Sequence, residues 1–132
     1  MEQKIVVHMR AGKIHKGITQ DFDPELDSFH VLPAEGGGVP IRVRVAEMKA
    51  LFWVRDYLGN RKFVARRDFA EVEDSGRRAV VVFEDGEEVW GTLEGGNRDG
   101  AGFFLRPADR QDNNVRMFVS RCAMKDLRLV EA

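Results

Sequence analysis

The sequence predicts an all-β protein built from two tandem copies of a small five-stranded barrel. Three observations support this prediction: an internal repeat, short apolar runs that end at Gly, Pro or Asn, and a length of only 132 residues. A chain of this length forms one ordinary domain or two very small ones. Because a lone five-stranded barrel is marginally stable, we expect the two copies to pack as a pseudo-twofold pair.

The internal repeat appears when the chain is shifted by 74 residues, which places Lys4 to Val45 on Arg78 to Val119 without a gap. This register defines a first repeat over 1–54, a linker over 55–76 and a second repeat over 77–132. The identical matched residues are Val6/Val80, Val7/Val81, Gly12/Gly86, Gly17/Gly91, Phe29/Phe103, Pro33/Pro107, Ala34/Ala108, Arg42/Arg116 and Val45/Val119.

Each repeat contains five apolar runs separated by turn residues, which predicts five short strands. The first two runs are joined at Ala11-Gly12 and at Asp85-Gly86, and a dipeptide of this kind is typical of a tight hairpin turn. Gly17 and Gly91 lie inside the second run, where a strand of a small barrel bends sharply or admits another backbone. The predicted strands are 5–10, 13–19, 28–32, 41–45 and 49–54 in the first repeat, and 78–83, 87–94, 102–106, 115–119 and 125–130 in the second.

Charge and cysteine content narrow the function classes. The chain has 21 Lys and Arg against 22 Asp and Glu, a net charge of -1 that excludes a globally basic nucleic-acid binder. The single cysteine, Cys122, cannot form an internal disulfide and favours a reducing compartment. Since no stretch approaches the roughly 20 apolar residues of a membrane helix, and the N-terminus lacks a signal peptide, we expect a cytoplasmic protein without membrane contact.

The second repeat reads Gly86-Glu87-Glu88-Val89-Trp90-Gly91-Thr92-Leu93, which resembles the first Sm motif, Gly-x-x-apolar-x-Gly-x-apolar. In the first repeat, Asp23-Pro24 follows Gly17 at the place where Sm proteins carry an acidic residue of their RNA loop. The Arg-Gly pair of the second Sm motif is absent. The resemblance therefore implies Sm-like or SH3-like small barrels and leaves the function open. By its whole layout the chain also resembles a family of short uncharacterised bacterial proteins.

The linker and the end of the fifth strand combine cations with aromatic residues. This composition is typical of interface hot spots and predicts a surface that binds a partner protein. The alternative is that Phe52 and Trp53 finish a core strand while the cations form a solvated surface. The stretch 61–72 also allows one short helical turn. The predicted partner-binding residues are Trp53, Arg55, Tyr57, Arg61, Phe63, Arg66 and Arg67.

All three histidines lie in the first repeat, where the second has Val82, Val89 and Phe104. A two-residue turn at Ala11-Gly12 would place His8 directly opposite His15 across the hairpin. Two facing imidazoles make a weak candidate for a metal site or a pH switch. Apolar residues at the matched positions favour packing instead, so we expect no metal and no cofactor.

The scattered carboxylates suit turn geometry, and Cys122 suits a small buried position at a strand start, so we expect no enzyme. The favoured function is a non-enzymatic protein-interaction or regulatory adaptor that binds through the linker surface and strand edges in the bacterial cytoplasm. The alternative is an Sm-like RNA binder with contacts at Asp23, Asn97 and Lys62. A third hypothesis is a cyclic-dinucleotide sensor, from a faint similarity of Arg66-Arg67 and Asp74-Ser75-Gly76 to the PilZ signature. The choice between a monomer and a homo-oligomer stays open.

Overall fold

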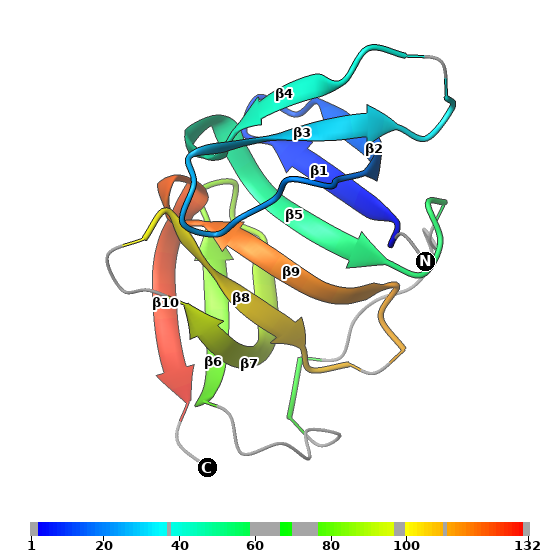
Figure 1. Cartoon of the computed structure of the whole chain (residues 1–132). Coiled ribbons are helices and arrows are strands. Elements are labelled where there is room, and N and C mark those ends of the chain that lie inside the picture. Colours follow the sequence, from blue (N-terminus) through cyan, green and yellow to red (C-terminus); the bar gives the residue numbers. More distant parts are fainter. Residues whose placement is uncertain are drawn as a thin grey trace.

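The computed structural model describes residues 3–36, 38–58, 67–69, 77–96, 100–109 and 111–130. Within these ranges the protein is all-β, and its strands form one open antiparallel sheet in the order β10-β6-β7-β8-β9-β5-β1-β2-β3-β4 (Figure 1). The strands are β1 (Ile5–Met9), β2 (Ile14–Ile18), β3 (Ser28–Pro33), β4 (Ile41–Arg44), β5 (Met48–Val54), β6 (Arg77–Phe83), β7 (Glu88–Gly96), β8 (Gly102–Pro107), β9 (Asn114–Ser120) and β10 (Met124–Val130). The short 3-10 helices η1 (Val45–Glu47) and η2 (Arg121–Ala123) precede β5 and β10. All ten predicted strands are present.

The two repeats occupy the two halves of this sheet. Each contributes five adjacent strands in the same order, namely fifth, first, second, third and fourth. They are joined where β5, the fifth strand of the first repeat, pairs with β9, the fourth strand of the second. A twofold contact would pair a strand with its own counterpart. The strand pairing between the repeats is therefore head-to-tail, and the expected pseudo-twofold arrangement is not the one observed.

The first hairpin has a three-residue loop. The Met9 N–H donates to the Lys13 carbonyl (2.8 Å), and the Gly12 N–H donates to the Met9 carbonyl (3.0 Å). Gly12 has a φ of 101°, which suits the bulge residue that ends such a loop. His8 therefore pairs with Ile14, and His15 pairs with Val7. The prediction that His8 faces His15 is wrong, because one extra loop residue shifts the register and puts the imidazoles on opposite faces.

Two hydrophobic clusters form the core, and they share the β5–β9 junction. Ala50, Phe52 and Val54 belong to one cluster with β6, β8 and β9 residues of the second repeat. Leu51 lies in the other cluster, with Phe29 and the rest of the first-repeat core. Successive side chains of a strand point to opposite faces, so the single strand β5 contributes to both cores. Buried side chains of the two repeats consequently contact each other across the β5–β9 junction.

The linker falls largely outside the described residues. This applies to 59–66 and 70–76, and with them to most of the predicted helical turn over 61–72. In the described part, Phe69 packs on Trp90 of β7 with ring centroids 5.4 Å apart, and the Arg78 guanidinium lies over the Phe69 ring. The linker thus contacts the second repeat at Phe69. In the portion of the chain that the structure describes, no helix has the length and apolar character needed to cross a membrane.

Candidate functional site

The ten-stranded sheet ends in two unpaired edges, β4 and β10, which lie at opposite ends of the molecule (Figure 1). The direction of the β4 backbone groups follows from one hydrogen bond, in which the Val45 N–H donates to the Asp27 carbonyl (2.9 Å) on the β3 side. Backbone groups of alternate residues in a strand point to opposite sides. The N–H and C=O groups of Arg42 and the N–H of Arg44 therefore point away from β3, toward the open edge, while the Arg44 carbonyl accepts the first hydrogen bond of η1.

The equivalent edge of the second repeat is occupied within the molecule. Its fourth strand is β9, and β5 pairs along it with Leu51 opposite Phe118 and Trp53 opposite Arg116. The ladder continues beyond β5, where the Arg55 N–H donates to the Asn113 carbonyl (3.0 Å). The fourth strand of a repeat is thus able to accept a strand from outside that repeat. In the first repeat, no strand of the described residues lies on this acceptor edge.

Two arginines stand on the open edge. Arg42 and Arg44 of β4 are exposed, and they lie on the same face as their cross-strand neighbours His30 and Ser28. Within the described residues neither arginine has an ion-pair partner. Other arginines of these ranges are paired with glutamates: Arg10 with Glu84, Arg106 and Arg116 with Glu94, and Arg128 with Glu88. The open edge therefore presents two cations that no acidic side chain of the described ranges compensates.

An open hollow of about 410 Å³ lies beside this edge, lined by Gln20, Asp21, His30, Leu32 and Pro40. Asp21 organises its wall. Its carboxylate accepts the backbone N–H of His30 (2.8 Å) and lies 2.7 Å from the His30 Nδ1. The backbone hydrogen bond from His30, followed by the contact with its ring, lowers the pKa of Asp21 below its usual value. An ionised Asp21 holds His30 in place on β3, next to Arg42.

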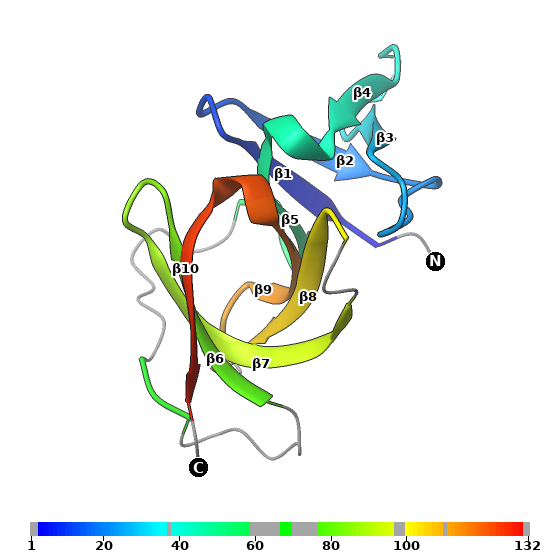
Figure 2. The same cartoon turned by 90° about the vertical axis from the view of Figure 1, so that its left-hand side faces the viewer.

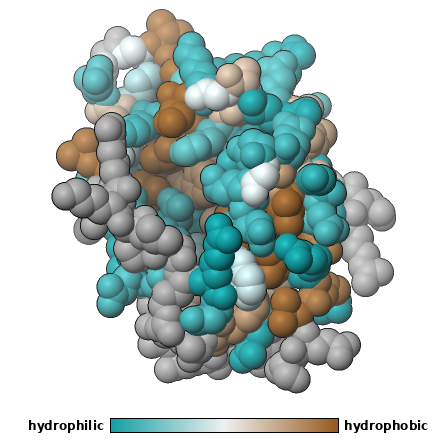
Figure 3. Space-filling view, turned by 180° about the vertical axis from the view of Figure 1, so that it is seen from behind, coloured by the Kyte–Doolittle hydropathy of each residue, from teal (hydrophilic) through white to brown (hydrophobic). Residues whose placement is uncertain are grey.

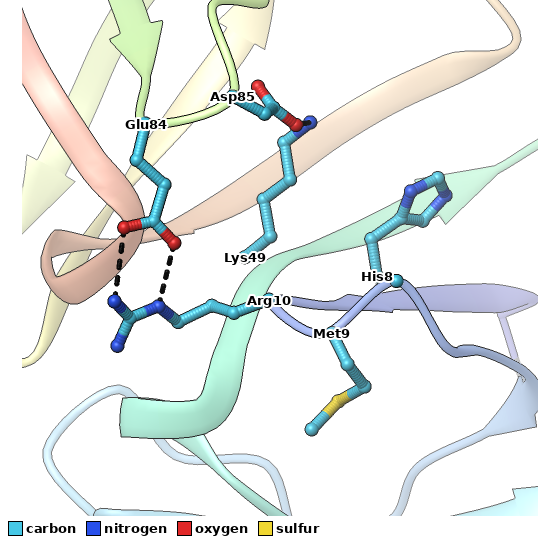
Figure 4. A pocket seen from close by; sticks show the side chains of 7 residues that line it. His8, Met9, Arg10, Lys49, Glu84 and Asp85 are labelled. Carbon is cyan, nitrogen blue, oxygen red and sulfur yellow. Dashed lines mark hydrogen bonds and ion pairs between the residues drawn. The ribbon is translucent and has the colours of Figure 1, made fainter.

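The turns of the β1–β2 and β6–β7 hairpins lie on the same side of the molecule (Figure 2). A second, smaller pocket of about 130 Å³ lies where the two repeats meet, at the ends of these hairpins (Figure 4). Arg10 from the first hairpin donates two hydrogen bonds to Glu84 of the second, at 2.9 and 3.0 Å. Lys49 reaches Asp85 (2.7 Å) and Glu87 (3.1 Å). These ion pairs link the two repeats. Because Arg10 and Lys49 are each paired with a carboxylate, neither offers a free positive charge to a ligand in the pocket.

His8 lines this junction pocket and stays neutral at neutral pH. Its ring packs edge-on against Phe52, with centroids 4.9 Å apart. Burial lowers its pKa, and the positive charges of Lys49 and Lys16 lower it further, while Glu87 opposes them. The imidazole is therefore a packing group. The parts of the chain that the structure describes contain no cluster of three or more His, Cys, Asp or Glu side chains able to hold a metal ion.

Four of the seven predicted partner-binding residues lie in the described part of the chain, and they differ in exposure. The Trp53 ring is partly buried against Phe22 and Phe104. The Tyr57 hydroxyl donates to the Gly17 carbonyl (2.9 Å), and burial raises the Tyr57 pKa. Arg55 and Arg67 are exposed. The remaining members of the predicted linker surface, Arg61, Phe63 and Arg66, lie outside the described residues.

The other predicted positions are accounted for in part. Asp23 is exposed and accepts the backbone N–H of Glu25 (2.9 Å), a bond that shapes the turn before β3. Lys62 and Asn97, the other two predicted RNA contacts, lie outside the described residues. Cys122 is exposed in η2, so the expectation of a buried thiol at a strand start is wrong. The single 3-10 turn η2 separates β9 from β10, and it directs the Cys122 side chain outward.

Sequence reasoning predicted binding at strand edges but did not single out β4, because it could not tell which strand would end the sheet. The repeat carried a signal: Arg42 occupies the place on β4 that the buried Phe118 occupies on β9. A cation that replaces a buried aromatic residue at an equivalent strand position indicates that this strand has a different neighbour.

Exposed apolar residues do not suggest a competing site. The large ones are Ile14, Leu26, Val39, Leu58, Val115 and Leu129. On the face seen in Figure 3, hydrophobic surface appears as separate areas bordered by hydrophilic side chains. A contiguous apolar patch is the usual mark of a hydrophobic docking surface. The open backbone edge is therefore the stronger candidate.

Comparison with known families matches the chain to the family of unknown function DUF6982 over residues 1–131. The chain belongs to DUF6982. No curated protein and no solved structure matches it. The function of this DUF6982 protein is consequently argued from its own edge strands, charges and repeat symmetry.

Proposed function

We propose that this DUF6982 protein is a non-enzymatic interaction module that binds an extended segment of a partner protein along the open edge of β4. The observation that carries the proposal is internal: β9, the counterpart of β4, already accepts β5 at the same edge. Strand addition of this kind derives affinity from main-chain hydrogen bonds and specificity from alternate side chains. The same edge in the first repeat has outward backbone groups, and none of the described strands pairs with it.

The length of the edge bounds the strength of binding. β4 has four residues, and only the N–H and C=O groups of Arg42 and the N–H of Arg44 point outward. Pro40, the next outward position, has no N–H to donate. Each hydrogen bond adds about 0.5 to 1.5 kcal/mol net, so a short ladder gives reversible binding and needs help from side chains. Reversible binding suits a regulatory adaptor.

The proposal includes a fold type and a location. We take each repeat to be a small barrel of the SH3-like or Sm-like kind, since each orders its strands as fifth, first, second, third, fourth and places a 3-10 turn before the fifth. The predicted linker surface remains a second contact region of the same module, of which Arg55 and Arg67 are exposed. The single, exposed Cys122 favours the reducing bacterial cytoplasm.

The test blocks the edge without removing a side chain from the core. In Arg44→Pro, the outward N–H is lost while the ladder to β3 keeps its bonds, and the φ of Arg44 (-92°) is not far from the value that proline requires. The matched control is Leu129→Pro, which places proline on the other open edge. Tagged wild type and both variants are used to capture partners from lysate of the source organism, with and without nuclease, after circular dichroism has verified their folds.

We expect a protein retained by wild type and by Leu129→Pro, in the presence of nuclease, to be lost with Arg44→Pro. If Arg44→Pro keeps every partner that wild type binds, the β4 edge is not the binding site. If nuclease removes all partners, the chain binds RNA and the alternative Sm-like hypothesis replaces this proposal.

A further inference from the structure

The partner of β4 could in principle be a second copy of the same chain. The open strand β10 is the counterpart of β5, as β4 is the counterpart of β9, so the two outer edges match the two halves of the internal junction. On β10, Asp126 and Arg128 pair with Val82 and Val80 of β6. The Glu84 N–H donates to the Ala123 carbonyl (2.8 Å), which sets these pairs as the hydrogen-bonded ones. The backbone groups of Leu127 and Leu129 consequently point to the open edge.

Side chains on β10 oppose such a copy-to-copy contact. Asp126 and Arg128 stand where β5 has Ala50 and Phe52, which are buried in the core that the repeats share. Arg128 instead forms an ion pair with Glu88 (3.2 Å) on the surface of the second repeat. Burying these charges in the way that Phe52 is buried would be unfavourable.

The β10 backbone is also capped. The carboxylate of Asp126 accepts the Leu127 N–H (2.9 Å), which is the first donor that the open edge would offer. Charged residues and self-capped donors are the usual means by which an edge strand avoids pairing with another chain. β10 is therefore a closed end of the sheet, and β4 is the acceptor end.

The side chains of the β4 edge favour an acidic occupant. Arg42 lies opposite His30, as Phe118 lies opposite Phe104, so Arg42 takes the place of a side chain that is only 1% exposed at the internal junction. Arg44 takes the place of Ser120 in the same comparison. Both arginines are exposed, and within the described residues neither forms an ion pair. A strand that approached β4 as β5 approaches β9 would therefore meet two positive charges.

We infer that the segment added to β4 carries carboxylates at the two alternate positions that face Arg42 and Arg44, and that it comes from an acidic partner protein rather than from a second copy. This inference rests on the proposed function and names its partner chemistry. Residues directly opposite in an antiparallel pair lie close enough for opposite charges to attract. Asp21 does not compete for these arginines, because its carboxylate is engaged by His30.

The test uses two labelled synthetic peptides of equal length, rich in Val and Thr, with two Glu or two Lys separated by one Val. Fluorescence anisotropy measures their affinity for wild type, for the double variant Arg42→Glu with Arg44→Glu, and for a control with the same charge change elsewhere, Arg77→Glu with Lys125→Glu. We expect wild type and the control to prefer the Glu peptide by at least about tenfold, and the edge variant to reverse the preference. Equal affinities in all three proteins would overturn the inference.

Further measurements test RNA and a second copy of the chain as occupants of the β4 edge, and they distinguish a failure of this inference from a failure of the proposed function. A labelled single-stranded RNA that binds wild type more tightly than the Glu peptide, or a concentration-dependent dimer that Arg44→Pro abolishes, would each contradict an acidic protein partner. If lysate capture depends on Arg44 but the peptides do not discriminate by charge, the proposed function stands and this inference fails. If Arg44→Pro affects neither capture nor peptide binding, the proposed function itself fails.

Discussion

Arg10 and Glu84 occupy equivalent positions in the two repeats, 74 residues apart, and they bind each other. The Arg10 guanidinium donates from Nε and Nη2 to the two carboxylate oxygens of Glu84, and from Nη1 to the Ala46 carbonyl. Equivalent residues of the two hairpins thus meet at the junction and carry opposite charges. The two copies have become complementary where they contact each other, whereas the side chains on the outer edges, β4 and β10, do not complement each other in this way.

Glu84→Gln is expected to lower the melting temperature slightly at low salt. The bidentate pair is largely exposed, so its contribution is modest and screened by ions. Melting curves at low and high salt check this, with the exchanged pair Arg10→Glu plus Glu84→Arg as the restoring control. A loss that is the same at both salt concentrations would show that the pair does not act through charge.

Stability is expected to fall as the pH drops below about 6.5, because of His8. Burial lowers the pKa of His8 in the folded state, so below the ordinary histidine value the unfolded chain binds the proton more readily. The folded state is consequently favoured above that value and loses stability as the pH falls. His8→Val, which installs the residue of the second repeat, should reduce the loss between about pH 7.5 and 5.5 in urea titrations.

The matched control for that experiment is His15→Val. His15 is less buried than His8, and burial followed by the charge of Lys13 lowers its pKa. We expect it to change the pH dependence in the same direction by a smaller amount. If His15→Val has the larger effect, the assignment to His8 is wrong.

Gly17→Ala should destabilise the protein by about 1 to 3 kcal/mol or more, because a Cβ at this position would overlap the Leu32 carbonyl of β3. Gly12→Ala is the comparison: its Cβ would meet nothing, and only its positive φ opposes the change, at about 1 kcal/mol. Chemical denaturation ranks the two. A smaller loss for Gly17→Ala would mean that β2 and β3 separate easily.

Trp53→Ala should cost about 3 kcal/mol of stability, since the ring contacts Phe22 and Phe104 and lies under the Arg116 guanidinium. These contacts join the repeats, so urea unfolding should shift as one transition. A variant with unchanged stability but lost partner binding would restore Trp53 as a surface contact. A large stability loss would instead assign it to the core.

The strands were predictable because alternation, turn residues and the repeat all act locally. Gly17 and Gly91 predicted a close approach of another backbone segment. In the structure, the Leu32 carbonyl lies against Gly17 and the Arg106 carbonyl lies against Gly91. Registers were less predictable. The facing of His8 and His15 depended on whether the hairpin loop holds two or three residues, and a single residue moves every side chain to the other face.

The candidate site was predictable only in part. Trp53 and Tyr57 have the composition of an interface, yet both are partly covered by other parts of the chain, because composition does not reveal which side of a strand is covered. Arg42 and Arg44 look like ordinary outward residues of an alternating strand. Their significance depends on which strand lies beside β4, and that is a long-range fact.

The sequence alone determined the class, the duplication and the ten strands, since these depend on residue preferences over a few neighbours and on a register that repeats. Only the tertiary structure decided how the repeats join. Pairing of β5 with β9 brings together residues that are far apart in the sequence, as with Leu51 and Phe118, and local preferences do not specify such a partner. This pairing leaves β4 as an open edge of the sheet, and it is this position that makes Arg42 and Arg44 candidates for binding.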